Sequence, residues 1–218
     1  MSNQFYNEYP KFLVSVDCII FGFKEGSLKL LVQKRPYNPG KDEMSLIGGF
    51  VEKGESVDET AQRILTKFTG LGKVYMHQLG AFGAVERDPG ERVISIGYYA
   101  LINFEDFDES LRRENEAKWV DIDKVPQLFS DHNVMVEKAR KNMQRRINTP
   151  TICINLLPKQ FTLTQLQTLQ EAILGVGLDK RNFRRSIADK DYIVKTKYID
   201  KSTSKRGARL YEFNLEDI

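Results

Sequence analysis

The sequence is poor in the residues that metal and disulfide chemistry require. Its 218 residues include two cysteines, two histidines and one tryptophan. Cys18 and Cys153 lie in apolar stretches, and neither has a second cysteine or a histidine at zinc-ligand spacing. This pattern predicts two buried free thiols in a reducing compartment and excludes a disulfide framework.

Long apolar runs are also missing. A transmembrane helix needs about 20 consecutive apolar residues, and no segment comes close to that length. The polar start of the chain lacks the basic and apolar regions of a signal peptide. We therefore predict a cytoplasmic protein with no membrane partner. The hydrophobic share of 41% and the charged share of 29% are typical of globular domains, and the length allows one large or two modest domains.

The net charge of +3 conceals an uneven distribution. Residues 151–218 contain 12 basic and 8 acidic residues, and within 180–209 the numbers are 11 and 3. Residues 1–150 are almost balanced, with 21 basic and 22 acidic residues. A basic block confined to one small region predicts contact with nucleic acid, although such charge is often only a solvated face.

Apolar patterning predicts a mixed α/β arrangement over the first 150 residues. Residues 12–23 form an apolar stretch typical of a central strand, and a turn at 24–27 predicts a hairpin with a returning strand over 28–35. Further strands are expected over 74–84 and 93–104. Helical spacing predicts helices over about 55–69 and 132–147.

Residues 49–71, GFVEKGESVDETAQRILTKFTGL, hold the spacing of a known sequence motif. Gly49, Glu55, Arg63 and Gly70 stand where the Nudix box has the same residue types, so this segment resembles that box. The family pattern also has three glutamates after the arginine, at positions that share one helix face and converge on divalent metal. This chain has Ile64, Lys67 and Phe68 there.

These replacements remove the oxygen ligands that Mg²⁺ requires. We therefore expect a Nudix-like domain that binds without catalysis, with no catalytic residues, no metal and no cofactor. The alternative is a divergent Nudix hydrolase, which would hold metal through Glu52, Glu55, Glu59 and Glu86.

The C-terminal region has the pattern of a winged helix-turn-helix. Thr162 and Gln165 fit a capping box, Gly175–Gly177 suits the turn between two helices, and Asp179 can cap the second helix. Phe183 and Ile187 are spaced to face inward. A strand from 192, a basic tip over 201–207 and a returning strand from 208 complete the pattern.

In this arrangement the second helix enters the major groove of double-stranded operator DNA, while the hairpin tip contacts phosphates. A basic helix in a protein-interaction module is the alternative. The predicted DNA-binding residues are Lys180, Arg181, Asn182, Arg184, Arg185, Lys205 and Arg206.

Nearly the whole chain resembles the Nudix-related transcriptional regulators. The stretches that carry the resemblance include QLGAFG from residue 78, RDPGERVISIGYYAL from 87, LLPKQFTLTQLQ from 156 and LDKRNFRR from 178. The resemblance implies an α/β fold, with a Nudix-like sandwich and linking helix over 1–150 and a winged helix-turn-helix over 151–218. It also implies a homodimer.

The segment MSLI from residue 44 departs from the Trp-x-Leu-Pro of relatives that act on ADP-ribose. This departure favours the sugar-sensing branch of the family, for which L-arabinose is the expected effector. The leading hypothesis is therefore a repressor of sugar utilisation that the sugar releases from its operator. A regulator that senses ADP-ribose or a related nucleotide remains the alternative.

The effector should bind beside the glycine-rich loop, where polar groups and an apolar wall converge. The candidates lie on two strands, in the loop, on the following helix and around the 83–92 connection. They are Asp17, Lys34, Glu52, Arg63, Phe82, Glu86, Arg87 and Asp88.

Overall fold

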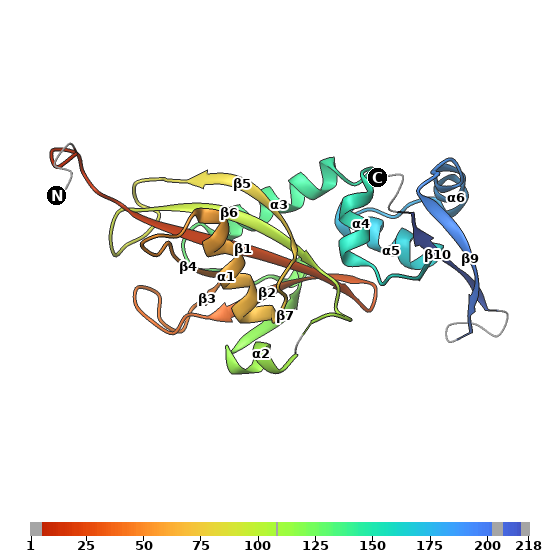
Figure 1. Ribbon diagram of the computed structural model, residues 1–218, viewed down its shortest axis with the longest axis horizontal. Helices are drawn as coiled ribbons and strands as arrows, with labels where there is room; N and C mark the ends of the chain where they lie inside the picture. Colours follow the sequence, from red (N-terminus) through yellow and green to blue (C-terminus); the bar gives the residue numbers. More distant parts are fainter. Residues whose placement is uncertain (1–5, 108, 202–206, 215–218) are drawn as a thin grey trace.

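The computed structural model describes residues 6–107, 109–201 and 207–214. Within these residues a seven-stranded mixed sheet and a three-stranded sheet lie at opposite ends of the molecule, with helices between them (Figure 1). The strands of the larger sheet are β1 (Leu13–Lys24), β2 (Ser27–Lys34), β3 (Met44–Ser45), β4 (Ile47–Phe50), β5 (Tyr75–Phe82), β6 (Val93–Ile102) and β7 (Ala117–Asp121). The helices around it are α1 (Val57–Thr69), α2 (Glu109–Glu114), the short 3₁₀ turn η1 (Ile122–Lys124) and α3 (His132–Arg145).

Strand β1 is the centre of the larger sheet, as its apolar sequence predicts. It pairs antiparallel with β2 and β4 and parallel with β6. Because side chains alternate along a strand, Val16, Cys18 and Ile20 are buried in the core under α1. Ile19 and Phe21 are buried in the core that includes α3. The sheet is thus covered by α1 on one face and α3 on the other.

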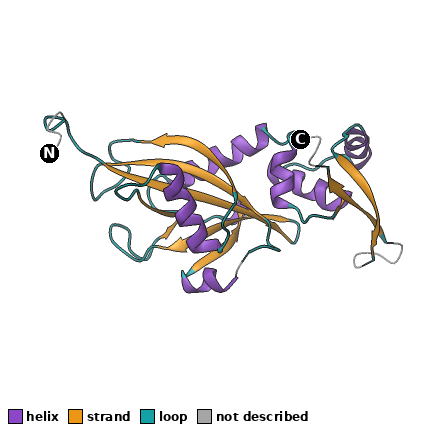
Figure 2. Ribbon diagram, in the orientation of Figure 1, coloured by secondary structure: helices purple, strands orange, loops and turns teal. Residues whose placement is uncertain are grey.

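The remaining elements are α4 (Pro150–Leu156), β8 (Phe161–Thr162), α5 (Leu163–Leu174), α6 (Lys180–Ala188), β9 (Ile193–Asp200) and β10 (Ala208–Phe213). Helices α5 and α6 precede the β9–β10 hairpin, which is the order of a winged helix (Figure 2). The boundary proposed between residues 150 and 151 falls at the start of α4 and stays a prediction.

The helix-turn-helix has the caps that its sequence predicts. Thr162 and Gln165 form a reciprocal capping box at α5, and Asp179 accepts from the Asn182 backbone N–H at α6. Gly175 ends α5 with φ of 74°, a conformation that glycine adopts without strain. Phe183 is buried against α5 in a core that is continuous with the α3 face of the larger sheet.

A close backbone approach between β1 and β4 fixes one glycine. Gly48 lies opposite Asp17 in the antiparallel pair. A Cβ atom at Gly48 would lie 2.4 Å from Asp17 Oδ1 and 2.7 Å from the Val16 carbonyl oxygen. The absence of a side chain therefore leaves room for the buried carboxylate of Asp17.

We predict that Gly48→Ala lowers the free energy of unfolding by about 1–3 kcal/mol, because an extra methyl group overfills a packed site. Urea unfolding would measure the change. Gly72→Ala is the matched control, because a Cβ there has no neighbouring atom within 4 Å. Equal urea midpoints for the two variants would show that the close contact with Asp17 does not make Gly48→Ala destabilising.

Candidate effector pocket and DNA-binding surface

A polar cavity lies at the end of the larger sheet, between β1, the β3–β4 segment and the start of α3. It encloses about 50 Å³. The lining residues are Ser15, Asp17, Gln33, Arg35, Tyr37, Leu46, Gly48, Gly49, Phe50, Arg87, Asp88, Val93, Phe129 and His132. The cavity therefore brings together Asp17, Arg87 and Asp88 from the predicted set.

Arg87 forms the central ion pairs of this cavity. Its Nε and Nη2 atoms donate to the two carboxylate oxygens of Asp131 at 3.0 and 2.8 Å, and Nη2 lies 3.4 Å from Asp17 Oδ2. The Arg87 side chain is only 4% exposed. Burial opposes its charge, but the hydrogen bond to Asp131 and the two carboxylates raise its pKa above the usual arginine value. The guanidinium is therefore held charged inside the fold.

Asp17 is the second buried charge. Its Oδ2 accepts from Ser95 Oγ at 2.6 Å, and its Oδ1 lies 3.7 Å from His132 Nε2. His132 Nδ1 accepts from the Leu46 backbone N–H at 3.1 Å, which places the ring proton on Nε2, facing Asp17. Burial lowers the pKa of His132, and a ring whose Nδ1 accepts a hydrogen bond is the neutral form. His132 thus braces the β3–β4 segment against α3.

Aromatic groups form the outer wall of the cavity. The Arg35 guanidinium lies 4.0 Å from the ring centre of Phe129 and 5.0 Å from that of Tyr37. Tyr37 and Phe50 are about half exposed at the entrance. The site combines the buried carboxylate of Asp17, the partly exposed carboxylate of Asp88, two guanidinium groups and exposed aromatic faces. Together these groups suit a ligand with hydroxyl, anionic and aromatic parts.

The helix that carries catalytic acids in Nudix enzymes has become part of the core here. Ile64 and Phe68 are 3% and 5% exposed and pack in the cluster under the sheet. Lys67, in the second glutamate position, lies with its ammonium group 5.5 Å from the Phe68 ring centre. Among the described residues, no group of three or more His, Cys, Asp or Glu side chains is placed to hold a metal ion.

Arg63 and Glu52 lie outside the cavity. Arg63 instead makes a bidentate pair with Glu55, at 2.6 and 2.8 Å, and also donates to the Phe50 carbonyl oxygen. The Arg63 hydrogen bond holds the pKa of Glu55 at about 2. Glu52 lies 3.6 Å from Arg63 at the surface. These residues fasten the glycine-rich loop to α1.

The structure also places Lys34, Phe82 and Glu86 away from the cavity. Lys34 pairs with Asp42 at the surface, Phe82 lies under the ammonium group of Lys138, and Glu86 is exposed. Their ligand-binding roles stay predictions.

Sequence reasoning missed several residues that line the cavity. Gln33 and Arg35 lie two positions apart at the end of β2, a spacing that places them on one face. This signal was available from the sequence. Phe129 could not be predicted from such a spacing, because its contact with Arg35 joins segments that lie far apart in the chain.

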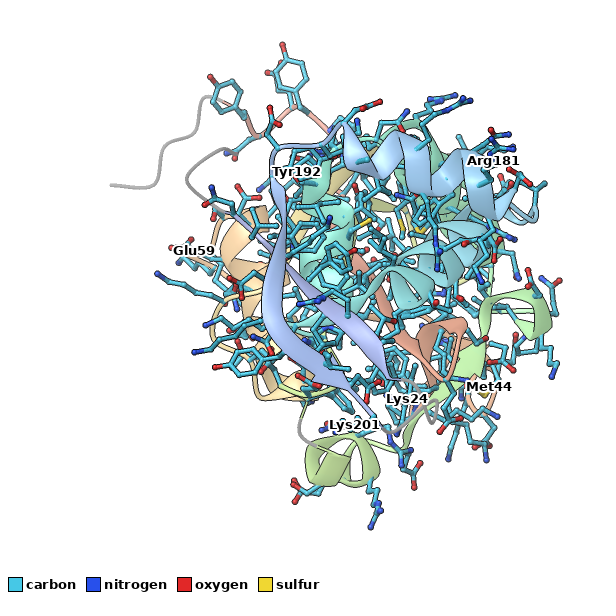
Figure 3. The ribbon with its side chains drawn as sticks, turned by 90° about the vertical axis from the view of Figure 1, so that its right-hand side faces the viewer. Lys24, Met44, Glu59, Arg181, Tyr192 and Lys201 are labelled. Atoms are coloured by element: carbon cyan, nitrogen blue, oxygen red, sulfur yellow. The ribbon has the colours of Figure 1, made fainter. Side chains whose placement is uncertain are left out.

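The candidate DNA-binding surface is the outer face of α6. Phe183 and Ile187 face the core, whereas Arg181, Arg184 and Arg185 are exposed. Figure 3 looks onto α6 beside the β9–β10 hairpin, with Arg181 pointing outward. Lys180 and Asn182 are also exposed, and the Asn182 side chain accepts a hydrogen bond from Arg185.

A groove of about 550 Å³ separates α6 from the hairpin. Arg184 lines it from α6, and Lys195 and Arg209 line it from the strands. The predicted wing residues Lys205 and Arg206 lie outside the described residues. The described part of the hairpin therefore places basic side chains in the same groove as Arg184 of α6.

Comparison with known families agrees with both halves of this description. A Nudix domain model matches residues 11–139, and a model described as the NrtR DNA-binding winged helix domain matches residues 153–213. The fold and the two matches define a Nudix-type domain joined to a DNA-binding winged helix.

A curated relative matches almost the full chain. It is the ADPR responsive transcriptional repressor NtrR of Acinetobacter baylyi, which is 33% identical over 215 residues, covering 97% of this chain and 86% of the relative. The chain therefore belongs to the NrtR-like family of ligand-responsive, DNA-binding transcriptional repressors. An ADP-ribose pyrophosphatase of Methanocaldococcus jannaschii is 34% identical over 135 residues, covering 61% of this chain and 75% of that protein.

Solved structures show the same two-part fold. Shewanella oneidensis NrtR complexed with a 27mer DNA has a TM-score of 0.81 and 26% identity, covering 92% of this chain and 93% of that one. A MutT/nudix family protein from Enterococcus faecalis has a TM-score of 0.76 at 22% identity, covering 96% and 91% of the two chains, and shows the fold alone.

These comparisons confirm the predicted regulator class but do not support L-arabinose as the effector. The curated relatives are named for ADP-ribose, which favours the nucleotide-sensing alternative. The departure at residues 44–47 misled the prediction because that segment contributes only Leu46 to the cavity, whereas the charged groups come from other elements. Among the described residues, no helix has the length and apolar composition to cross a membrane.

We predict that Arg87→Met lowers the free energy of unfolding by about 3–5 kcal/mol, because Asp17 would be left buried without its cationic partner. Urea unfolding at pH 7 would measure the loss. Lys34→Met, which removes an exposed ion pair, is the control and should leave the midpoint unchanged. Similar midpoints for both variants would mean that Asp17 is compensated by other groups.

We also predict that Arg184→Ala weakens binding to DNA selected by the wild-type protein from a random pool. The expected loss is about 1–3 kcal/mol, with relaxed preference at one base position. Lys118→Ala, at an exposed position on β7, is the control and should bind as the wild type does. Fluorescence anisotropy would give both affinities, and an unchanged affinity for Arg184→Ala would remove this residue from the interface.

Proposed function

We propose that this protein is a transcriptional repressor that ADP-ribose releases from its operator. The observation that carries the proposal is the match, over 97% of the chain, to a repressor named as ADPR responsive. The chemistry of the cavity supports it independently of that name.

ADP-ribose combines groups that the cavity can recognise. Its ribose hydroxyls can donate to the carboxylates of Asp17 and Asp88, and its diphosphate can accept from Arg35 and Arg87. The enclosed space is much smaller than the about 300–1,000 Å³ of a typical ligand site. We therefore propose that one part of the ligand enters the cavity while the rest lies across its entrance, near Tyr37.

The altered α1 favours binding without cleavage. Ile64 and Phe68 supply apolar packing where an enzyme of this fold places metal-binding carboxylates, and Lys67 adds a positive charge. A retained effector suits a sensor, because a ligand that is not consumed reports its own concentration. This difference separates our proposal from the activity named for the pyrophosphatase relative.

We further propose that two copies bind one operator in the cytoplasm. A dimer places two α6 helices in successive major grooves when they lie about 34 Å apart. An effector can then control binding by changing that spacing, provided that it binds the two arrangements with different affinities.

We predict that saturating ADP-ribose weakens operator affinity by about 5–150-fold, which is the effect of a coupling free energy of about 1–3 kcal/mol. Anisotropy titrations with ADP-ribose, with L-arabinose and without ligand would measure it. L-arabinose should have no effect.

A control for cleavage accompanies this titration. Chromatography after incubation with Mg²⁺ should recover intact ADP-ribose, and its EDTA-sensitive cleavage would favour the hydrolase alternative. An operator affinity that ADP-ribose leaves unchanged would reject it as the effector.

A further inference from the structure

The two residues before α3 have an unusual backbone. Ser130 has φ of 53°, in the left-handed region that a residue with a side chain adopts at an energetic cost. Asp131 follows as the N-cap residue of α3. Strain of this kind persists only where neighbouring contacts hold it, so the contacts of these two residues are informative.

Asp131 does not cap its own helix. Among the described residues, Ser56, Thr162 and Asp179 are N-cap residues with capping side chains, and they have extended backbones with ψ of 166°, 153° and 120°. Asp131 has ψ of 13° and makes no side-chain capping hydrogen bond. Aspartate is among the preferred N-cap residues, so a favourable alternative arrangement is available to this side chain.

Arg87 holds both residues in place. Its guanidinium donates two hydrogen bonds to the Asp131 carboxylate, and its backbone carbonyl accepts from the Ser130 hydroxyl. Arg87 lines the cavity, whereas Asp131 does not. One residue of the candidate effector site therefore fastens the strained start of α3.

The other end of α3 contacts the DNA-binding part. Gln144 Nε2 donates to the carbonyl oxygens of Ile173 and Leu174, the last two residues of α5, at 3.0 and 3.4 Å. The turn after α5 leads directly into α6. Since α3 has 14 residues, a rise of about 1.5 Å per residue gives a rigid connection of roughly 21 Å between these ends.

We propose that Arg87, Ser130 and Asp131 form the switch through which the effector controls the DNA-binding surface. This inference rests on the proposed function, because it assigns the effector's diphosphate as the group that competes with Asp131 for Arg87. When Arg87 turns to the diphosphate, Asp131 is freed to cap α3 and Ser130 leaves its strained conformation. The start of α3 then moves, and the helix transmits this movement to α5. The arrangement held by Arg87 is the operator-binding one.

The first test needs no effector. Asp131→Ser can cap α3 but is too short to pair with Arg87, so the free protein should adopt the released arrangement. We expect its operator affinity to fall by about 5–150-fold, the range of a typical allosteric coupling. Asp123→Ser is the matched control, because it removes an exposed carboxylate paired with Arg140 of α3, and it should bind the operator as the wild type does. Wild-type affinity in Asp131→Ser would overturn the switch.

A second pair of variants tests whether the positive φ of Ser130 is strained. This pair also tests the switch if Asp131→Ser does not fold. Ser130→Gly and Ser130→Ala both lose the hydroxyl, but only glycine adopts a positive φ freely. The urea midpoint of Ser130→Gly should exceed that of Ser130→Ala. ADP-ribose should also weaken operator binding by Ser130→Gly less than it weakens operator binding by Ser130→Ala. An equal or lower midpoint for Ser130→Gly would contradict the stored strain.

Adding ADP-ribose separates this inference from the proposed function. Asp131→Ser should bind ADP-ribose at least as tightly as the wild type by calorimetry, yet show little further loss of operator affinity. If the wild type does not bind ADP-ribose, the effector is wrong, while the effector-free comparison still decides the switch. If the wild type responds to ADP-ribose and Asp131→Ser responds equally, the switch is wrong and the proposed effector stands.

Discussion

The buried guanidinium of Arg87 joins segments of the Nudix-type domain that lie far apart in the sequence. It lies between Asp17 of β1 and Asp131 before α3, so it joins β1, the 83–92 connection and the start of α3 at one point. A buried charge is costly unless partners compensate it. The network therefore adds a buried ionic contact between these three elements, and a ligand that engages Arg87 would change this contact.

Helix α1 departs from the Nudix pattern at the three glutamate positions. On α1, Ile64 and Phe68 belong to the core and Lys67 is exposed, while the ion pair between Arg63 and Glu55 joins the loop to the helix. Asp17 and Arg87 are buried ionic groups that line the cavity. The cavity thus lies in a domain whose helix α1 contributes to the core.

The sequence predicted the elements governed by local rules and failed where distant segments meet. The β1–β2 hairpin, α1, α3 and the caps of α5 and α6 follow from alternation, helical spacing and capping residues, all of which act within a few positions. The short strands β3, β4, β7 and β8 lack such signals, because they are defined by pairing with distant partners. In the candidate site, Asp17 and Arg87 line the cavity, whereas Lys34 and Glu86 face elsewhere because strand register and loop path decide the direction of a side chain. Their roles in binding stay predictions. The effector was misjudged from one short segment whose side chains hardly enter the cavity.

The central claim is that one conformational equilibrium links the cavity to the operator-binding surface. Linkage requires each ligand to weaken the other by the same factor. The most direct measurement is a calorimetric titration of ADP-ribose into the free protein and into its complex with operator. We expect weaker ADP-ribose binding to the complex, by the same factor by which ADP-ribose weakens operator binding. Equal ADP-ribose affinity for the free and operator-bound protein would contradict it.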